Sequence, residues 1–102
     1  MDTGLTQYMV VFTLPQPLTE AFISQIPQQR QAVNRLLHSG KILNYALSLE
    51  TSTLWSVFSA HSEAELMELI SSLPLTSYMK VHISELTFFQ SANAFAPTFS
   101  VN

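Results

Sequence analysis

Side chains that could move a proton occupy alternate positions between residues 78 and 84. The order Tyr-Met-Lys-Val-His-Ile-Ser places a phenol, an ammonium, an imidazole and a hydroxyl on one side and apolar groups on the other. A period of two is typical of a β-strand whose faces meet different surroundings. His82 is the best candidate for a base, because histidine changes charge near neutral pH, and Lys80 or Tyr78 are the candidates to stabilise a developing enolate. The alternatives are that His82 lies at a subunit interface or near solvent, and that Lys80 only extends to water at a sheet edge.

A second group of side chains is suited to holding a flat, unsaturated ligand. Tyr45 and Trp55 lie in segments rich in strand-forming residues, and with Tyr78 they could form pocket walls that stack on a ring. Met9 and Asn44 complete the expected ligand-binding set. The alternative is that the aromatic residues and Met9 belong to an ordinary core.

Several other kinds of site are excluded by residues that the chain lacks. Without cysteine there is no disulfide, thiolate nucleophile or cysteine-ligated metal. The three histidines, at positions 38, 61 and 82, are scattered over separate elements without metal-binding spacing, so we expect no metal site. Two glycines cannot form a glycine-rich phosphate loop, and no serine sits in a nucleophile-elbow pattern. We therefore expect no cofactor.

Charge and hydropathy limit the partners of the chain. Four basic and seven acidic residues give a net charge of −3 without a basic cluster, which argues against nucleic acid. No apolar run approaches the ~20 residues of a membrane-spanning helix. The first residues lack the basic and apolar regions of a signal peptide, so we expect a cytoplasmic protein. Charged residues make up only 11% of the chain, against about a quarter in a typical domain, which indicates that apolar surface is buried between subunits.

The elements that position these side chains follow from periodicity and from stop signals. Strands are predicted at residues 7–14, 41–49 and 54–60, and a fourth from residue 78. The first helix begins at an N-cap on Thr19 and ends at Gly40, with a kink or a fresh start at Pro27. A capping box of Ser62 and Glu65 opens the second helix. This order predicts an α+β, ferredoxin-like βαββαβ domain, in which an antiparallel four-stranded sheet carries two helices on one face.

The predicted plan leaves the other face of the sheet without helices. A second copy placed face to face would cover it and form a dimeric α+β barrel, so we expect a homodimer or a higher homo-oligomer. We place the domain at residues 1–89. The tail, residues 90–102, has no helical period but carries Phe95, Phe99 and Val101, and we expect it to dock on a neighbouring subunit rather than to fray.

Three short motifs resemble the muconolactone Δ-isomerase family. They are RLLHSGKI at residues 35–42, WSVFSAHS at 55–62 and LPLTSYM at 73–79, and the resemblance extends from about Gln7 to Leu86. It implies a ferredoxin-like domain paired into a dimeric α+β barrel. It also implies an isomerase that shifts a double bond in a small unsaturated lactone during aromatic-compound breakdown, by proton transfer without metal or cofactor.

The chain departs from that family where catalysis is concerned. The resemblance implies Lys and Glu in the first helix, where this chain has Ile26 to Gln31, and Arg and His in the second strand, where it has Leu43, Asn44 and Leu47. Two functional hypotheses stay open. The chain is an isomerase-like protein that binds a small unsaturated lactone or acid in a barrel cavity and could transfer a proton through His82. Alternatively, it is a non-catalytic ligand-binding or assembly module that has lost the active site.

Overall fold

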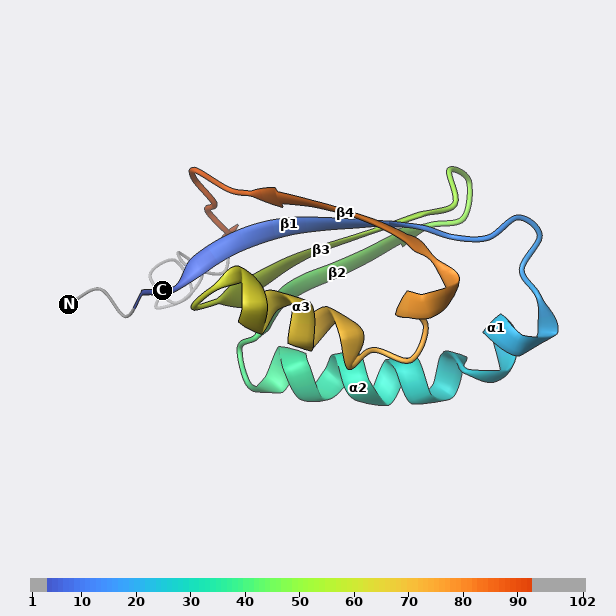
Figure 1. Cartoon of the computed structure of the whole chain (residues 1–102). Coiled ribbons are helices and arrows are strands. Elements are labelled where there is room, and N and C mark those ends of the chain that lie inside the picture. Colours follow the sequence, from blue (N-terminus) through green and yellow to red (C-terminus); the bar gives the residue numbers. More distant parts are fainter. Residues whose placement is uncertain (1–3, 93–102) are drawn as a thin grey trace, which may run out of the picture.

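The computed structural model describes residues 4–92, which form one layer of sheet and one layer of helices (Figure 1). The strands are β1 (Thr6–Thr13), β2 (Ile42–Ser48), β3 (Thr53–Ala60) and β4 (Lys80–Glu85), and the helices are α1 (Glu20–Ser24), α2 (Ile26–His38), α3 (Glu63–Ser71) and the 3₁₀ turn η1 (Thr76–Tyr78). The strands pair antiparallel in the order β2-β3-β1-β4. The predicted α+β, ferredoxin-like arrangement is confirmed, with the first helix divided in two.

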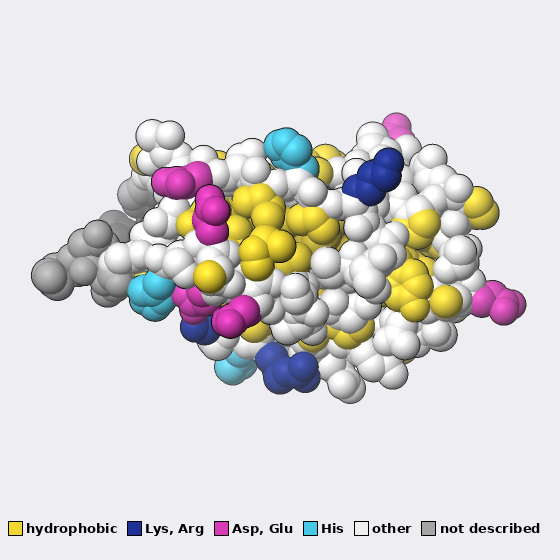
Figure 2. Space-filling view, in the orientation of Figure 1, with side chains coloured by type: hydrophobic (Ala, Val, Ile, Leu, Met, Phe, Trp, Pro, Cys, Tyr) yellow, Lys and Arg dark blue, Asp and Glu magenta, His cyan; other side chains and the backbone are white. Residues whose placement is uncertain are grey.

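The core lies between the sheet and the helices because alternate residues of every strand point toward the helices. We call this side of the sheet the helix face. Val10 and Phe12 of β1 and Phe58 of β3 lie on it with no exposed surface. The remaining core residues are Tyr8, Leu14, Phe22, Ala32, Val33, Ile42, Leu54, Ala60, Leu66, Ile70, Leu73 and Leu75. Figure 2 shows apolar side chains at the surface between the sheet and the helices, and partly buried apolar residues pack against the core.

The opposite side of the sheet carries no helix, and we call it the open face (Figure 1). The register of the strands places there the residues between those of the core: Gln7, Met9, Val11, Thr13, Asn44, Ala46, Ser48, Thr53, Trp55, Val57, Ser59, Lys80, His82 and Ser84. The predicted separation of the sheet into a covered and an uncovered face therefore holds within the single chain.

Helices α1 and α2 begin and end where the local chemistry predicts. The Thr19 side chain accepts a hydrogen bond from the backbone N–H of Phe22, which makes Thr19 the N-cap of α1. Pro27 lies in the first turn of α2, where its missing N–H costs nothing, so the fresh start predicted at this proline is confirmed. Gly40 ends α2 with φ +78°, and the Lys41 N–H donates to the Leu36 carbonyl to close the turn.

The start of α3 is held by a polar cluster rather than by a simple capping box. Ser62 Oγ accepts from the Glu65 N–H at 3.1 Å, as predicted. The Glu65 carboxylate, however, accepts from the backbone N–H and Nδ1 of His61 and from Lys41 Nζ at 3.3 Å. The His61 backbone bond, followed by its side-chain bond and then by Lys41, lowers the pKa of the Glu65 carboxyl to about 2.

One strand boundary differs from the sequence prediction. The fourth strand begins at Lys80, because Tyr78 belongs to η1 and its N–H donates to the Leu75 carbonyl. Tyr78 therefore does not share the strand face of Lys80 and His82, and that expectation was wrong. The predicted docking segment with Phe95, Phe99 and Val101 lies outside the described residues. Within residues 4–92, no helix is long and apolar enough to cross a membrane.

Candidate functional site

Five of the predicted site residues share the open face: Met9, Asn44, Trp55, Lys80 and His82. His82 pairs with Val11 on β1, and Val11 pairs in turn with Trp55 on β3. In the next row across the sheet, Met9 pairs with Val57. Since neighbouring strands lie about 4.8 Å apart, His82 and Trp55 are separated by roughly 10 Å across the sheet. The open face thus holds an imidazole and an indole on either side of an apolar strip, with Lys80 two residues from His82.

Asn44 has a structural task on this face. The register between β2 and β3 shifts between Ile42 and Asn44, as in a β-bulge. Asn44 Oδ1 accepts from the Val57 N–H at 2.8 Å, and the Asn44 carbonyl accepts from Ser56 Oγ at 2.7 Å. The Asn44 side chain therefore satisfies backbone that the bulge leaves without its regular partner.

Tyr45 lies on the opposite side of the sheet from Trp55. Tyr45 pairs with Ser56 and faces the helices, whereas Trp55 pairs with Ala46 and faces away from them. The prediction that Tyr45 and Trp55 form the walls of one pocket is therefore wrong within a single chain, because neighbouring residues of a strand point to opposite faces.

Tyr45 instead lines a cavity of about 230 Å³ between the helix face of the sheet and helices α1 and α2, which we call the inner pocket. Its lining is mostly aliphatic, with one phenol, one amide and one guanidinium. The lining residues are Leu14, Leu18, Phe22, Ile26, Gln29, Arg30, Tyr45, Leu47, Leu49, Leu54, Leu75 and Met79. Among the described residues, no aspartate, glutamate or histidine lines it.

The polar wall of the inner pocket is built from three elements. Gln29 of α2 is 3% exposed, and its Nε2 donates to the Tyr45 hydroxyl at 2.9 Å. Gln29 Oε1 accepts from the Leu75 N–H at 3.0 Å, just before η1. Burial raises the pKa of the Tyr45 phenol, and the hydrogen bond from Gln29 offsets part of that rise. Tyr45 is therefore a neutral phenol over the physiological pH range.

Arg30 lies at the rim of the inner pocket and is exposed to solvent. Neither of the ion pairs formed among residues 4–92 involves Arg30. A guanidinium is permanently charged and matches a carboxylate in geometry. The inner pocket therefore combines an apolar interior, a phenol and a cationic rim.

Gln29 is not among the site residues predicted from the sequence. The signal was present in the spacing. Ile26, Gln29, Val33 and Leu36 recur at intervals of three and four residues, which places Gln29 on the apolar stripe of α2. A polar residue on such a stripe needs a buried partner, and Gln29 has two.

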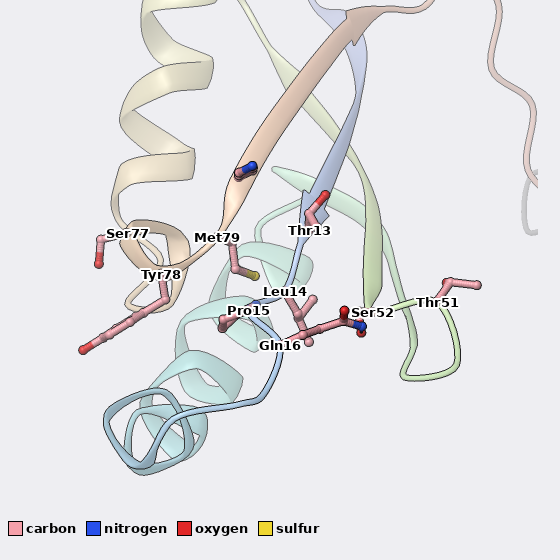
Figure 3. Close-up of a pocket in the computed structure, with 10 residues that line it drawn as sticks. Thr13, Leu14, Pro15, Gln16, Thr51, Ser52, Ser77, Tyr78 and Met79 are labelled. Carbon is pink, nitrogen blue, oxygen red and sulfur yellow. The ribbon is translucent and has the colours of Figure 1, made fainter.

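Tyr78 and Lys80 line a second, more open cleft of about 540 Å³, which we call the outer cleft (Figure 3). Tyr78 packs edge-on against Phe22, with ring centroids 6.0 Å apart, and its ring extends away from Leu14 and Gln16 in Figure 3. The outer cleft shares Leu14 and Met79 with the inner pocket, so these two side chains separate the cavities. His82 lines neither cavity.

The described residues contain no group of three or more side chains of the histidine, cysteine or carboxylate type that could hold a metal ion. The inner pocket, as the described residues line it, instead offers hydrogen bonding, apolar contact and one guanidinium.

Comparison with known proteins agrees with this fold. Residues 7–92 match the family model described as muconolactone delta-isomerase. A crystal structure of muconolactone isomerase at 3.3 Å resolution superposes with a TM-score of 0.67, covering 83% of this chain and 92% of that one at 24% sequence identity. At that identity the superposition shows the fold alone. A search of curated proteins finds no significant match.

Proposed function

The chain belongs to the muconolactone delta-isomerase family, and on that premise we propose that it binds a small unsaturated lactone or acid in the inner pocket. The observation that carries this proposal is the apolar cavity between sheet and helices with a single phenol in its wall. Its volume of about 230 Å³ is below the roughly 300–1,000 Å³ typical of sites for drug-sized ligands. A ligand with one five- or six-membered ring suits that space.

The single charge at the pocket, on Arg30, supports binding of an acid as well as of a neutral lactone. Arg30 at the rim could pair with a carboxylate that remains near water, while the ring enters the apolar interior. The Tyr45 phenol could meet a ring carbonyl there. Because the lining within residues 4–92 provides no carboxylate or imidazole base, binding at this pocket is the part of the family's function that its residues support.

Proton-transfer isomerisation is the second candidate, and it depends on the open face. The shared face of the sheet favours a site with His82 as the base and Lys80 as the stabiliser of the enolate. The ligand contacts on the same face would be Trp55, Met9 and Asn44. Tyr78 lines the outer cleft together with Lys80, so it could contribute to such a site only from that cleft. A non-catalytic assembly module with the same barrel is the alternative.

The test is a ligand screen by thermal shift with small lactones, muconate-like diacids and phenolic acids, followed by calorimetric titration of the hits. We expect Tyr45→Phe to weaken binding about tenfold, the value of one hydrogen bond, and Trp55→Phe to leave it unchanged. If Trp55→Phe and His82→Gln abolish binding while Tyr45→Phe does not, the ligand occupies the open face and the inner-pocket proposal is wrong. Turnover that His82→Gln abolishes would establish the isomerase.

We also propose that a second copy of the chain covers the open face. Trp55 on that face is 37% exposed, and among the described residues of the open face Lys80 is the one with a permanent charge. Sedimentation equilibrium should give the mass of a dimer or larger oligomer, and Trp55→Lys should shift it toward the monomer. A stable, folded wild-type monomer at micromolar concentration would contradict this. The cytoplasmic location and a role in aromatic-compound breakdown stay predictions.

A further inference from the structure

The hydrogen bonds of Gln29 leave its amide only one orientation. The Leu75 N–H lies 3.0 Å from Gln29 Oε1 and, as a donor, needs an acceptor. The oxygen of the amide must therefore face Leu75, and the NH₂ group must face the Tyr45 hydroxyl 2.9 Å away. Leu75 is 6% exposed and Gln29 3% exposed, so water does not compete freely for either group. The backbone of Leu75 thus decides which end of the amide Tyr45 meets.

This orientation also decides the role of the phenol. A phenol has one proton to donate and lone pairs that accept. Because Gln29 already donates to the Tyr45 oxygen, the Tyr45 proton points away from Gln29, and among residues 4–92 the hydrogen bond of the Tyr45 hydroxyl is the one it accepts from Gln29. Burial raises the pKa of Tyr45 and so favours retention of that proton. Tyr45 is left as a hydrogen-bond donor in the wall of an apolar pocket.

We propose that Gln29 is a positioning residue that sets the specificity of the inner pocket, by committing Tyr45 to donate to the ligand. The pocket then selects a ring that carries an acceptor oxygen, such as the carbonyl of a cyclic ketone or lactone, over a ring of the same shape without one. This inference rests on the proposed function, since it concerns the ligand of the same pocket. It adds that the Leu75 backbone orients the Gln29 amide, and that the Gln29 amide orients the Tyr45 hydroxyl.

The experiment uses two probes of matched ring size, 2-cyclohexenone, which only accepts hydrogen bonds, and phenol, which also donates. Calorimetry gives both affinities, and the infrared carbonyl stretch of bound 2-cyclohexenone reports its hydrogen bond directly. We expect a stretch lowered on binding to the wild-type chain. In Tyr45→Phe, the lowering should disappear and the affinity for 2-cyclohexenone should fall about tenfold.

The near-isosteric variant Gln29→Glu tests the positioning role at alkaline pH, where the introduced carboxylate is ionised. A carboxylate still accepts from the Leu75 N–H, but it now also accepts the hydrogen bond from the Tyr45 hydroxyl. The Tyr45 oxygen therefore presents a lone pair to the ligand in place of its proton. We expect affinity for 2-cyclohexenone to fall about tenfold and the preference to shift toward phenol. A merely structural Gln29 would weaken both probes alike and leave the stretch unchanged.

The outcomes separate this inference from the proposed function. If neither probe nor any screened ligand binds the wild-type chain, the proposed function fails and this inference fails with it. If 2-cyclohexenone binds with no lowering of its stretch, or if Tyr45→Phe binds it equally well, only the inference is overturned. Tyr45→Phe keeps the ring and its packing, so it decides the matter even if Gln29→Glu does not fold.

Discussion

Replacing Gln29 by Met should destabilise the domain, although the two side chains are of nearly equal size. Met and Gln are unbranched, of similar length and similar helix propensity, so neither a large cavity nor a loss of helix is expected. What disappears is the amide that joins α2 to the Tyr45 hydroxyl on β2 and to the Leu75 N–H before η1.

The magnitude follows from the two groups left behind. The Leu75 N–H, in a residue that is 6% exposed, loses its acceptor, which costs about 1–3 kcal/mol. The Tyr45 hydroxyl loses a donor but faces the inner pocket, where water can replace it. This loss is therefore closer to the low end of the net value of a hydrogen bond, about 0.5 kcal/mol. Burying a thioether in place of an amide offsets part of this. We expect a net loss of about 2 kcal/mol in the free energy of unfolding, or roughly 10 °C in Tm for a domain of this size.

Urea denaturation followed by circular dichroism measures this loss, with Gln28→Met as the matched control, since Gln28 is the exposed neighbour on the same helix. The control should stay within about 0.5 kcal/mol of the wild type. A double-mutant cycle with Tyr45→Phe should show a coupling of about 0.5 kcal/mol for the amide–phenol bond. If Gln29→Met and Gln28→Met behave alike, the reasoning about the buried amide is refuted.

The remaining predictions concern the core, one turn and one carboxylate. Phe58→Ala should cost about 3–5 kcal/mol in urea denaturation because Phe58 has no exposed surface, whereas Phe88→Ala at 73% exposure should cost almost nothing; equal losses would contradict the assigned core. Gly40→Ala should cost about 1–2 kcal/mol from backbone strain alone, since φ is +78° and no atom lies within 4 Å of the added Cβ; an unchanged urea midpoint would argue against this turn. The His61 backbone and side-chain bonds hold the pKa of Glu65 at about 2 against a usual 4.5, so its stabilisation is complete above pH 4.5 and is lost as pH falls through about 2. In Glu65→Gln, the urea midpoint should therefore change less with pH between about 2 and 4.5 than it does in the wild type. Parallel curves of midpoint against pH for the variant and the wild type would show that the Glu65 cluster does not contribute to stability.

Local signals in the sequence were sufficient for the elements and for the fold. Thr19, Pro27 and Gly40 act on the backbone within one turn of themselves, so their effects are readable without the rest of the chain. The alternation in the segment that becomes β4 likewise placed Lys80 and His82 on the face away from the helices. Local chemistry and periodicity together imply the element order, and the order implies the ferredoxin-like sheet.

The composition of the candidate site was decided by tertiary structure. Whether Tyr45 and Trp55 share a face depends on the register between β2 and β3, and a slip of one residue would exchange the faces of a whole strand. The bulge at Asn44 and the turn that closes the hairpin set that register, and neither leaves an unambiguous mark in the sequence. Gln29 had a visible position on the apolar stripe, but its partners are 16 and 46 residues away in the chain. Sequence periodicity shows which way a side chain points within its own element, whereas only the packing of elements shows what it meets there.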